Sequence, residues 1–520
     1  MKESKNNNLL KLIFGIFIVI QPFLDIYFLY TDEVIQIFKF SPSTLIRFSF
    51  IGIIFVYMLI KYRKDKKIIP LVSYVIVSLI YAVLHHLFVK DFKSYSPDNF
   101  GYSTFKELFY IARLVLPVIL MFITVDFKYT FEDLKKCLCL VACIVGTVIV
   151  FANFFKIGLG SYTNEVIKDN IIGWFTGAYN QYSFYELASK GWFNFANQIS
   201  ALLIVLSFIT MYALLKKMSV YNVYNLVVIL LSMLMLGTKV ALYGAFLSLG
   251  ALIAIYIVGF VFDRRKLDIN KYSTILLVLL VVGYVGMIKF SPATNRAQIN
   301  NYIAVNREKE GNEKEEITMD ELIAELAVVK NASNEEKIDF IEENYERFSI
   351  DPMFIVDSYS YKIDPDFWLE MFEKPLSERI NYRSLEESMI KRVVNINGNP
   401  ISKLFGISYM RVQNIFNIER DFILQYYTVG LIGLVLFIVL PFIVSVAIIG
   451  ICMLRKHKEL LTHENMLLVA LVVLVVGIAY YSGNIMDSLI ITTYLSFIIG
   501  VLCNETIFKK KENDVKLLDK

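Results

Sequence analysis

The chain has 520 residues, of which 56% are hydrophobic and only 19% charged, and its mean hydropathy is +0.55. Soluble domains are less apolar and carry more charge, so this composition excludes an ordinary soluble protein and indicates a membrane protein. The net charge of +4, without a basic arm or an arginine-rich segment, argues against nucleic acid as a partner.

Twelve apolar segments are long enough to cross a bilayer as helices, which takes about 20 residues each. The first is too long for a cleaved signal peptide and leads directly to another span, so we expect it to remain in the protein. The predicted fold class is an all-α polytopic membrane protein with about 12 transmembrane helices. In chain order the predicted spans are 9–30, 43–60, 68–89, 105–125, 134–155, 193–215, 220–237, 239–262, 272–290, 421–454, 465–482 and 485–504.

Lysine and arginine predict the orientation of these spans, because short cytoplasmic connections are enriched in both. With the N-terminus inside, the inner segments hold 25 of these residues and the short outer connections about 8. The reverse orientation would place the clusters at 61–64 and 509–511 outside. We therefore expect both termini in the cytoplasm and the protein in the plasma membrane.

Two outer segments are too long to be turns, and they set the predicted domain organisation. Residues 1–290 would hold the first nine spans with the outer loop 156–192, residues 291–420 an extracellular domain, residues 421–504 the last three spans, and residues 505–520 a cytoplasmic tail. The extracellular domain carries 24 acidic and 16 basic residues. Nine spans followed by three do not match the paired halves of many transporters.

The large loop is predicted to be partly helical. Thr318-x-x-Glu321 and Ser333-x-x-Glu336 both have the capping-box pattern that begins a helix. A third helix is predicted over 376–394, with Leu385, Met389 and Val393 on one side.

Ionisable residues within the spans gather toward the outer leaflet. Asp25 is expected about 8 Å below the outer end of span 1, Arg47 about 6 Å into span 2 and Arg113 about 12 Å into span 4. Lys239 and Asp487 lie near the outer ends of later spans. A charge in hydrocarbon is costly unless it is paired or hydrated, so each is either a functional residue, a snorkelling side chain or part of an ion pair such as Asp25 with Arg47 or Arg113.

Several cations beside the outer leaflet suit a lipid-linked diphosphate, whose oxygens guanidinium groups bind in bidentate fashion. If the diphosphate leaves during a reaction, fixed arginine and lysine side chains would stabilise the charge that develops. The incoming sugar hydroxyl would need a carboxylate or histidine as general base. Electrostatics alone would equally fit an anion transporter.

Six short motifs occur in the order in which the O-antigen ligase/polymerase superfamily has them, and the chain resembles that superfamily over most of its length, outside roughly 300–370. The resemblance is to the Wzy-type polysaccharide polymerases, in particular their Gram-positive-like branch. The motifs are Gln21-Pro22-x-x-Asp25, Gly191-Trp192-Phe193-x-x-x-Asn197, Leu236-Gly237-Thr238-Lys239, Leu376-Ser377-Glu378-Arg379, Lys403-Leu404-Phe405-Gly406-Ile407-Ser408-Tyr409, and Glu419-Arg420-Asp421-Phe422 followed by Gly430-Leu431-Ile432-Gly433.

The resemblance implies a GT-C-like membrane glycosyltransferase without a cofactor or metal. Such an enzyme transfers a growing glycan from undecaprenyl diphosphate to an acceptor on the outer face, for a capsule, exopolysaccharide or wall polysaccharide. Its partners would be the lipid-linked oligosaccharide donor and acceptor, the lipid bilayer, a flippase and a chain-length regulator.

Two positions depart from the family pattern. Ligases and many polymerases carry a His-Asn or His-Ser pair at the loop exit, where this chain has Glu419 and Asp421, and position 378 is Glu where Gly is usual. Polymerisation is therefore favoured over ligation. A ligase, and a flippase or other transporter, remain the alternatives.

By this resemblance Arg379 would bind the donor diphosphate, the alternative being a surface arginine on a charged helix. Glu419 or Asp421 would orient or deprotonate the acceptor, the alternative being an ion pair with Arg420 or Arg411. The further predicted substrate-binding residues are Lys239, Arg113, Arg47 and Arg411, and the supporting residues are Asp25, Asp487 and Asn197.

Other polar residues are interpreted as structural. The His85-His86 pair near the outer end of span 3 could supply a base, but an interfacial structural role is favoured. Asp364-Pro365-Asp366 has the acidic spacing of a metal motif, yet a turn is the better interpretation because no nucleotide sugar is available outside the cell. The five cysteines lie in or near the inner halves of spans and imply no disulfide framework.

Overall fold

The structure is a computed structural model that describes residues 2–38, 41–92, 102–263, 269–299, 319–415, 418–455 and 457–508. Over these ranges helices are the only regular secondary structure, and the only extended pairings are three isolated bridges, such as the one between Ile26 and Phe193. The predicted all-α polytopic class is confirmed.

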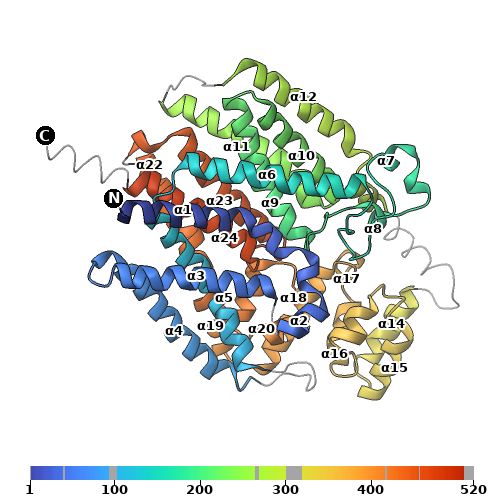
Figure 1. The fold of residues 1–520 in the computed structure, drawn as a ribbon. Helices are drawn as coiled ribbons and strands as arrows, with labels where there is room; N and C mark the ends of the chain where they lie inside the picture. The colour runs from blue at the N-terminus through green and yellow to red at the C-terminus, as the bar shows by residue number, and fades with distance from the viewer. Residues whose placement is uncertain are drawn as a thin grey trace. The chain divides into compact units, whose positions relative to one another are not determined.

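The α-helices run in chain order as drawn in Figure 1. Those before the large loop are α1 (Lys2–Ile20), α2 (Asp32–Phe38), α3 (Pro42–Lys61), α4 (Ile69–Val89), α5 (Thr104–Asp126), α6 (Phe131–Phe154), α7 (Gly173–Thr176), α8 (Phe184–Leu187), α9 (Ala196–Lys216), α10 (Val220–Leu236), α11 (Lys239–Asp263) and α12 (Lys271–Ile288). Those that follow are α14 (Met319–Val329), α15 (Asn334–Asn344), α16 (Pro365–Phe372), α17 (Leu376–Arg379), α18 (Tyr382–Asn397), α19 (Ile401–Phe405), α20 (Tyr409–Ile415), α21 (Asp421–Leu434), α22 (Ser445–Arg455), α23 (His463–Tyr481) and α24 (Leu489–Cys503).

Within the described ranges, eleven helical segments are long and apolar enough to cross a membrane, against the twelve predicted spans. The difference is the predicted span 220–237, which is the 17-residue helix α10. Gly237 ends α10 with φ of 67° and Lys239 begins α11, so a tight turn joins the two helices. The protein is an integral membrane protein.

The first span is shorter as an α-helix than the predicted 9–30. It ends at Ile20, and Pro22 lies in a 3₁₀ segment, Gln21–Asp25, which a second one, Tyr27–Tyr30, follows. Proline lacks an amide hydrogen and clashes with the preceding turn, so it disfavours continuation of the α-helix through this position. Asp25 therefore lies on an irregular segment.

The predicted span 421–454 is also irregular, although its ends are close to those predicted. Gly430 is non-helical, with φ of 67°, and residues Val435–Val444 form a π-helical segment that contains Pro441. Such kinks are typical of positions where proline or a tight contact interrupts the hydrogen-bond ladder.

The contacts divide the chain into two compact units, and the division falls within α4, α5 and the π-helical segment. One unit comprises 1–75, 113–296 and 438–520, and the other comprises 76–112 and 297–437. We call them the first and second units. The predicted domain boundaries are not tested by this division and remain predictions.

The core of the first unit is built around α9 and α24. Every residue of α9 from Ile199 to Leu215 is buried, as is every residue of α24 from Leu489 to Leu502. A helix that is apolar on all sides belongs at the centre of a bundle, and α6, α10, α11 and α23 pack against α9 (Figure 1). By contrast, only Ser273, Leu277 and Tyr284 are buried in α12.

The second unit contains the folded part of the large loop, whose core is strongly aromatic. Trp368 is completely buried, and the rings of Phe348 and Phe372 stack with centroids 4.1 Å apart. The Ser333 capping box is confirmed, as are the buried Leu385, Met389 and Val393. The predicted helix 376–394 is instead two helices, α17 and α18, which separate at residues 380–381.

Some predictions concern residues outside the described ranges. Thr318 of the first predicted capping box is one of them, although its helix is present as α14. Most of the predicted tail, 505–520, is another.

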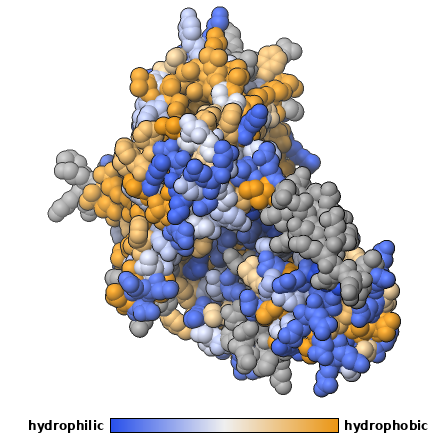
Figure 2. Space-filling model, turned by 90° about the vertical axis from the view of Figure 1, so that its right-hand side faces the viewer, coloured by the Kyte–Doolittle hydropathy of each residue, from blue (hydrophilic) through white to orange (hydrophobic). Residues whose placement is uncertain are grey.

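Figure 2 shows broad areas of hydrophobic side chains on the face in view, as is typical of a protein whose surface contacts lipid.

Candidate functional site

Arg379 lies at the C-terminal end of the short helix α17, against the aromatic core of the loop domain. Its guanidinium carbon is 5.4 Å from the centroid of the Phe348 ring, the ring that stacks on Phe372. Cation–π contact of this kind fixes a guanidinium plane without neutralising its charge. Arg379 is therefore held in place by a ring and keeps its full positive charge.

The side chain of Arg379 makes no hydrogen bond with any described residue, although its Nε and Nη1 are buried. Burial lowers the pKa of Arg379, because removal from water disfavours the charged form. A half-buried cation without a counter-charge is costly to keep. Such a group is suited to an anionic ligand that supplies the missing acceptors.

The exit of the large loop is tied to α18 by alternating charges. Glu419 accepts a hydrogen bond from Arg383 at 3.0 Å, and Arg420 donates one to Glu387 at 2.9 Å. The partner of Glu419 is thus Arg383, and the partner of Arg420 is Glu387. Glu419 remains partly exposed.

Glu386 on α18 is a buried carboxyl group beside this exit, and the sequence analysis did not identify it. It is 2% exposed, and its Oε2 accepts a hydrogen bond from the amide of Glu419 at 3.1 Å. Burial raises the pKa of Glu386 to about 8; the Glu419 amide opposes the rise, and the negative charge of Glu419 adds to it. The group is therefore largely protonated at neutral pH.

We expect the stability of the protein to fall as the pH rises from about 5 to 9, because of Glu386. A free glutamate has a pKa of 4.5, so between that value and about 8 the folded state binds more protons than the unfolded state, and deprotonation disfavours folding. The full shift corresponds to at most about 5 kcal/mol. Thermal unfolding in detergent should show this loss in the wild type and a flatter profile in Glu386→Gln.

The matched control for this prediction is Glu370→Gln, which changes an exposed carboxylate on α16 of the same domain. It should unfold with the wild-type pH profile. An equally steep profile in Glu386→Gln would show that another group causes the loss.

Asp421 is the first residue of α21 and is completely buried. Gln425 and Thr428 follow on the same face, both also completely buried. The Gln425 amide donates to the Tyr110 hydroxyl at 2.6 Å. Of the two predicted acidic residues, Glu419 is therefore the one more accessible to a substrate in this conformation.

Arg411 on α20 is occupied by backbone carbonyls. Its guanidinium donates to Val89 O at 2.6 Å, to Ile407 O at 3.1 Å and to Lys90 O at 3.2 Å. It also lies over the rings of Phe92 and Tyr102. Burial lowers its pKa. These contacts suit a residue that joins the end of α4 to the loop.

Two of the family-like motifs meet within the second unit, through glycines. The segment 405–409, which we call the strap, crosses the kink of α21, and the Ile407 amide donates to Tyr427 O at 2.8 Å. A Cβ on Gly406 would lie 2.2 Å from Thr428 O, and one on Gly430 2.3 Å from Leu404 O. Only glycine permits so close a crossing of two backbones.

Two other motifs meet within the first unit. The amide of Tyr27 donates to Trp192 O at 2.9 Å, and the amide of Asn194 donates to Asp25 O at 2.9 Å. Asn197, the predicted supporting residue, is partly buried in the first turn of α9. The motif that begins at Gln21 therefore packs on the motif that begins at Gly191.

Asp25 and Arg47 form a buried ion pair in the first unit, as one of the alternatives in the sequence analysis proposed. Arg47 Nη1 is 2.8 Å from Asp25 Oδ1, and Arg47 Nε donates to Gln21 Oε1 at 2.8 Å. The Tyr30 hydroxyl also donates to Asp25. Arg47 is 2% exposed, so its donors face this network.

Arg113 and Asp487, both partly buried, also lie together in the first unit. Arg113 Nη2 donates to the backbone oxygen of Asp487 at 2.9 Å and is 3.9 Å from its carboxylate. The contact joins α5 to the segment before α24. Asp487 thus holds one of the predicted cations in position.

Lys239 is exposed at the N-terminus of α11. It forms no ion pair with any residue in the described ranges. The turn before it is fixed by Gly237, whose Cβ would lie 2.7 Å from Ala188 Cβ, and by Thr238, whose hydroxyl accepts from the Ala241 amide at 3.1 Å. The turn therefore presents a lysine to solvent on a rigid support.

Arg296 is a further cation near this turn that sequence reasoning missed. It donates to the Tyr162 hydroxyl at 2.8 Å, and that hydroxyl donates to Gly237 O at 2.8 Å. Its guanidinium carbon is 4.5 Å from the Tyr162 ring centroid. No motif includes Arg296, and only the fold brings it to the Gly-Thr-Lys turn.

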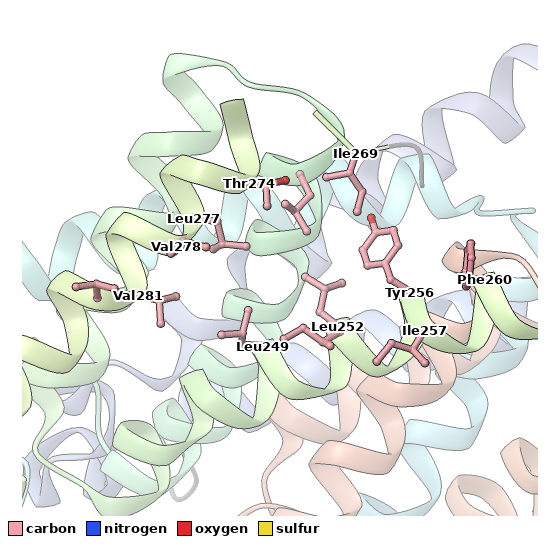
Figure 3. A pocket seen from close by; sticks show the side chains of 13 residues that line it. Leu249, Leu252, Tyr256, Ile257, Phe260, Ile269, Thr274, Leu277, Val278 and Val281 are labelled. Atoms are coloured by element: carbon pink, nitrogen blue, oxygen red, sulfur yellow. The ribbon is translucent and has the colours of Figure 1, made fainter. Parts of the chain in front are cut away.

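Two other features resemble functional sites but are not assigned to the candidate site. Asp364 caps α16 and accepts two hydrogen bonds from Arg392, at 2.8 and 3.1 Å, so the acidic motif is structural but begins a helix where a turn was predicted. A cavity of about 580 Å³ between α11 and α12 (Figure 3) is lined by side chains such as Leu249, Leu252 and Val278. This apolar lining offers no charge to a diphosphate.

The comparison with known families identifies the chain. A family model described as "O-antigen ligase like membrane protein" matches residues 6–507. No curated protein matches the chain. The match extends over nearly the whole sequence and agrees with the all-α membrane fold and the paired motifs. The chain therefore belongs to the O-antigen ligase-like membrane protein family.

Proposed function

We propose that this protein is a membrane glycosyltransferase that polymerises undecaprenyl-diphosphate-linked oligosaccharide repeats on the outer face of the plasma membrane. The product would be a capsule, an exopolysaccharide or a wall polysaccharide. The observation that carries the proposal is Arg379, a half-buried guanidinium whose buried Nε and Nη1 have no hydrogen-bond partner among the described residues. Family membership supports a role in glycan transfer in general.

In the proposed reaction a hydroxyl oxygen of the acceptor sugar attacks the anomeric carbon of the donor sugar. The bond from that carbon to the diphosphate breaks, and the diphosphate leaves on its polyprenyl chain. Arg379 binds the diphosphate oxygens and stabilises the charge that they gain. The hydroxyl proton passes to a carboxylate, for which Glu419 is the accessible candidate and Asp421 the buried one.

The remaining predicted residues divide by their contacts. Lys239 is exposed and has no ion pair among the described residues, and it is proposed to bind a substrate anion. Arg113 is proposed to serve the same purpose. Arg47 and Arg411 donate to groups of the protein itself, so we propose that they support the fold around the substrate. Arg296 joins Lys239 as a proposed anion-binding residue.

The proposal requires residues 291–420 to lie outside the cell. Lys362 is exposed in the loop domain, so a single cysteine placed there, in a variant whose native cysteines are replaced, should react with a membrane-impermeant maleimide on intact cells. A cysteine placed at Lys64, in a predicted inner connection, should react only after permeabilisation. The opposite pattern would overturn the proposed orientation and the reaction with it.

The direct test uses the purified full-length protein in detergent with a synthetic undecaprenyl-diphosphate oligosaccharide. Polymerisation predicts lipid-linked chains of two or more repeats, separated by length on a gel and identified by mass. Chains that move to another acceptor at unchanged length would identify a ligase. No turnover in detergent, together with movement of the lipid across liposome membranes, would identify a flippase and overturn the proposal.

A further inference from the structure

His85 and Glu107 form a completely buried pair in the second unit that the proposed reaction does not use. His85 lies on α4 and is 0% exposed, and Glu107 lies on α5 and is 1% exposed. The Nε2 of His85 is 2.8 Å from Glu107 Oε1. Two such groups are expensive to bury unless all their hydrogen-bonding atoms are satisfied. The hydrogen bonds of His85 and Glu107 therefore show which backbone segments the two side chains hold in place.

Both groups hold the two ends of the strap. His85 Nδ1 is 2.7 Å from Phe405 O, at one end, and both oxygens of Glu107 accept from the Tyr409 amide, at 3.1 and 3.0 Å, at the other. The hydroxyl of Tyr81, one turn before His85, donates to Val429 O on the kinked α21 that the strap crosses. Three side chains from α4 and α5 thus hold one crossing.

The hydrogen-bond partners fix the number of protons on the pair. A carbonyl oxygen only accepts, so Nδ1 of His85 carries a hydrogen toward Phe405 O. Nε2 and Oε1 both have lone pairs, so a contact of 2.8 Å requires a proton between them. The pair is then either imidazolium with carboxylate or imidazole with carboxylic acid, and in both forms its net charge is zero.

The strap leads directly into α20, which carries Arg411. Arg411 binds the strap through Ile407 O and binds the end of α4 through Val89 O. The charged and titratable groups that face the pair are Arg411 from α20, Tyr81 from α4 and Tyr102 from the segment before α5, each of which interacts electrostatically with Glu107. Loss of the shared proton would leave a net negative charge and two facing lone pairs.

We propose that His85 and Glu107 are positioning residues that share one proton and, in that state, clamp the strap, which fixes the loop between Arg379 and α21 for glycan transfer. The proposal rests on the proposed function for its link to transfer, and on geometry alone for the clamp. The proposal gives His85 a role in holding the backbone and excludes it as the base, because both of its ring nitrogens are engaged in hydrogen bonds within the protein.

Glu107→Gln separates positioning from proton chemistry. The glutamine amide can donate to Nε2 of a neutral His85 while its oxygen accepts from the Tyr409 amide, so each hydrogen bond is kept without a shared acidic proton. Glu107→Ala removes both bonds. We expect Glu107→Gln to transfer glycan within about 3-fold of the wild type and Glu107→Ala to lose about 100-fold, the scale of a 1 Å misplacement.

Amide hydrogen exchange of the full-length protein in detergent tests the clamp without any substrate. Peptides covering 405–412 should be protected in the wild type and in Glu107→Gln, and should exchange faster in Glu107→Ala. The ratio of wild-type to Glu107→Gln exchange, measured at one pH, cancels the intrinsic rate and should be close to one. His86→Ala, which removes a hydrogen bond to Tyr102, is the control and should leave this protection unchanged.

Each result decides one part of the proposal. Unchanged protection in Glu107→Ala would overturn the clamp. Intact protection in Glu107→Gln with transfer as low as in Glu107→Ala would show that the pair performs proton chemistry. If Glu107→Ala does not fold, loss of protection in a folded Glu107→Gln would still overturn the clamp, because that variant keeps each of the hydrogen bonds. Absence of transfer by the wild type would defeat the proposed function and leave the exchange result standing.

Discussion

Arg379→Ala should leave the protein folded and inserted while polymer formation falls by about 100- to 1,000-fold, and single repeats should accumulate on the lipid. This is the loss typical of removing one preorganised group that stabilises developing negative charge. The guanidinium makes no hydrogen bond with a described residue, so its removal takes away only the contact with the Phe348 ring. The thermal unfolding temperature should therefore be unchanged or higher, and the two readouts together distinguish a ligand-binding residue from a structural one.

Two further variants sharpen this test. Arg379→Lys keeps the charge without the bidentate geometry and should recover part of the activity. Arg347→Ala changes another partly buried arginine of the loop domain, one that donates to Asn344 at 3.3 Å, and should retain activity. Chain-length distributions on the lipid carrier measure both. Normal polymer lengths in Arg379→Ala would remove Arg379 from the mechanism.

Gly406→Ala and Gly430→Ala should each sharply reduce the yield of folded protein. Both glycines have positive φ, 80° and 67°, and an added Cβ would meet backbone atoms of the facing segment at 2.2 and 2.3 Å. A side chain at positive φ costs about 1 kcal/mol by itself, and the clash with a backbone adds to this because neither segment can move without breaking the crossing. Size-exclusion profiles and unfolding temperatures in detergent measure the loss.

Gly398→Ala is the matched control, because it isolates the cost of the backbone conformation. Gly398 lies in the same unit with φ of 65°, and the nearest atom to its Cβ would be Ile396 O at 3.9 Å. It should be much milder than the other two. Because Gly406 and Gly430 meet at one crossing, their double variant should lose less than the sum of the single losses. Equal effects at all three glycines would show that the crossing is unimportant.

Local sequence patterns predicted the helices well because hydropathy and capping are properties of neighbouring residues. The Ser333 capping box and the face containing Leu385 needed only contacts within one or two turns. The first span was predicted too long because its apolar run continues beyond Pro22, and the hydropathy of the run outweighed the proline. The predicted helix 376–394 is two helices in the structure, and the prediction missed the break because the apolar spacing continues across it.

The residues of the candidate site were less predictable, because charge partners come from distant segments. Asp25 had two plausible arginine partners by depth in the membrane, and only the fold assigns Arg47 to it. Glu419 faces Arg383, 36 residues earlier, which no periodicity indicates. Glu107 was not considered at all, since one acidic residue near the start of a span resembles an ordinary interfacial charge.

The sequence by itself determined that the chain crosses the membrane many times and which motifs link it to the O-antigen ligase-like family. It also showed where along the chain the large acidic loop falls. These features depend on composition and on order along the chain. Only the tertiary structure decided which charges are neutralised and which remain available. Three arginines show this. Arg47 is paired with a carboxylate, Arg411 donates to backbone carbonyls, and Arg379 makes no hydrogen bond with a described residue. The physical reason is that a buried cation acquires its partners from segments brought together by folding, so its availability is not encoded near it.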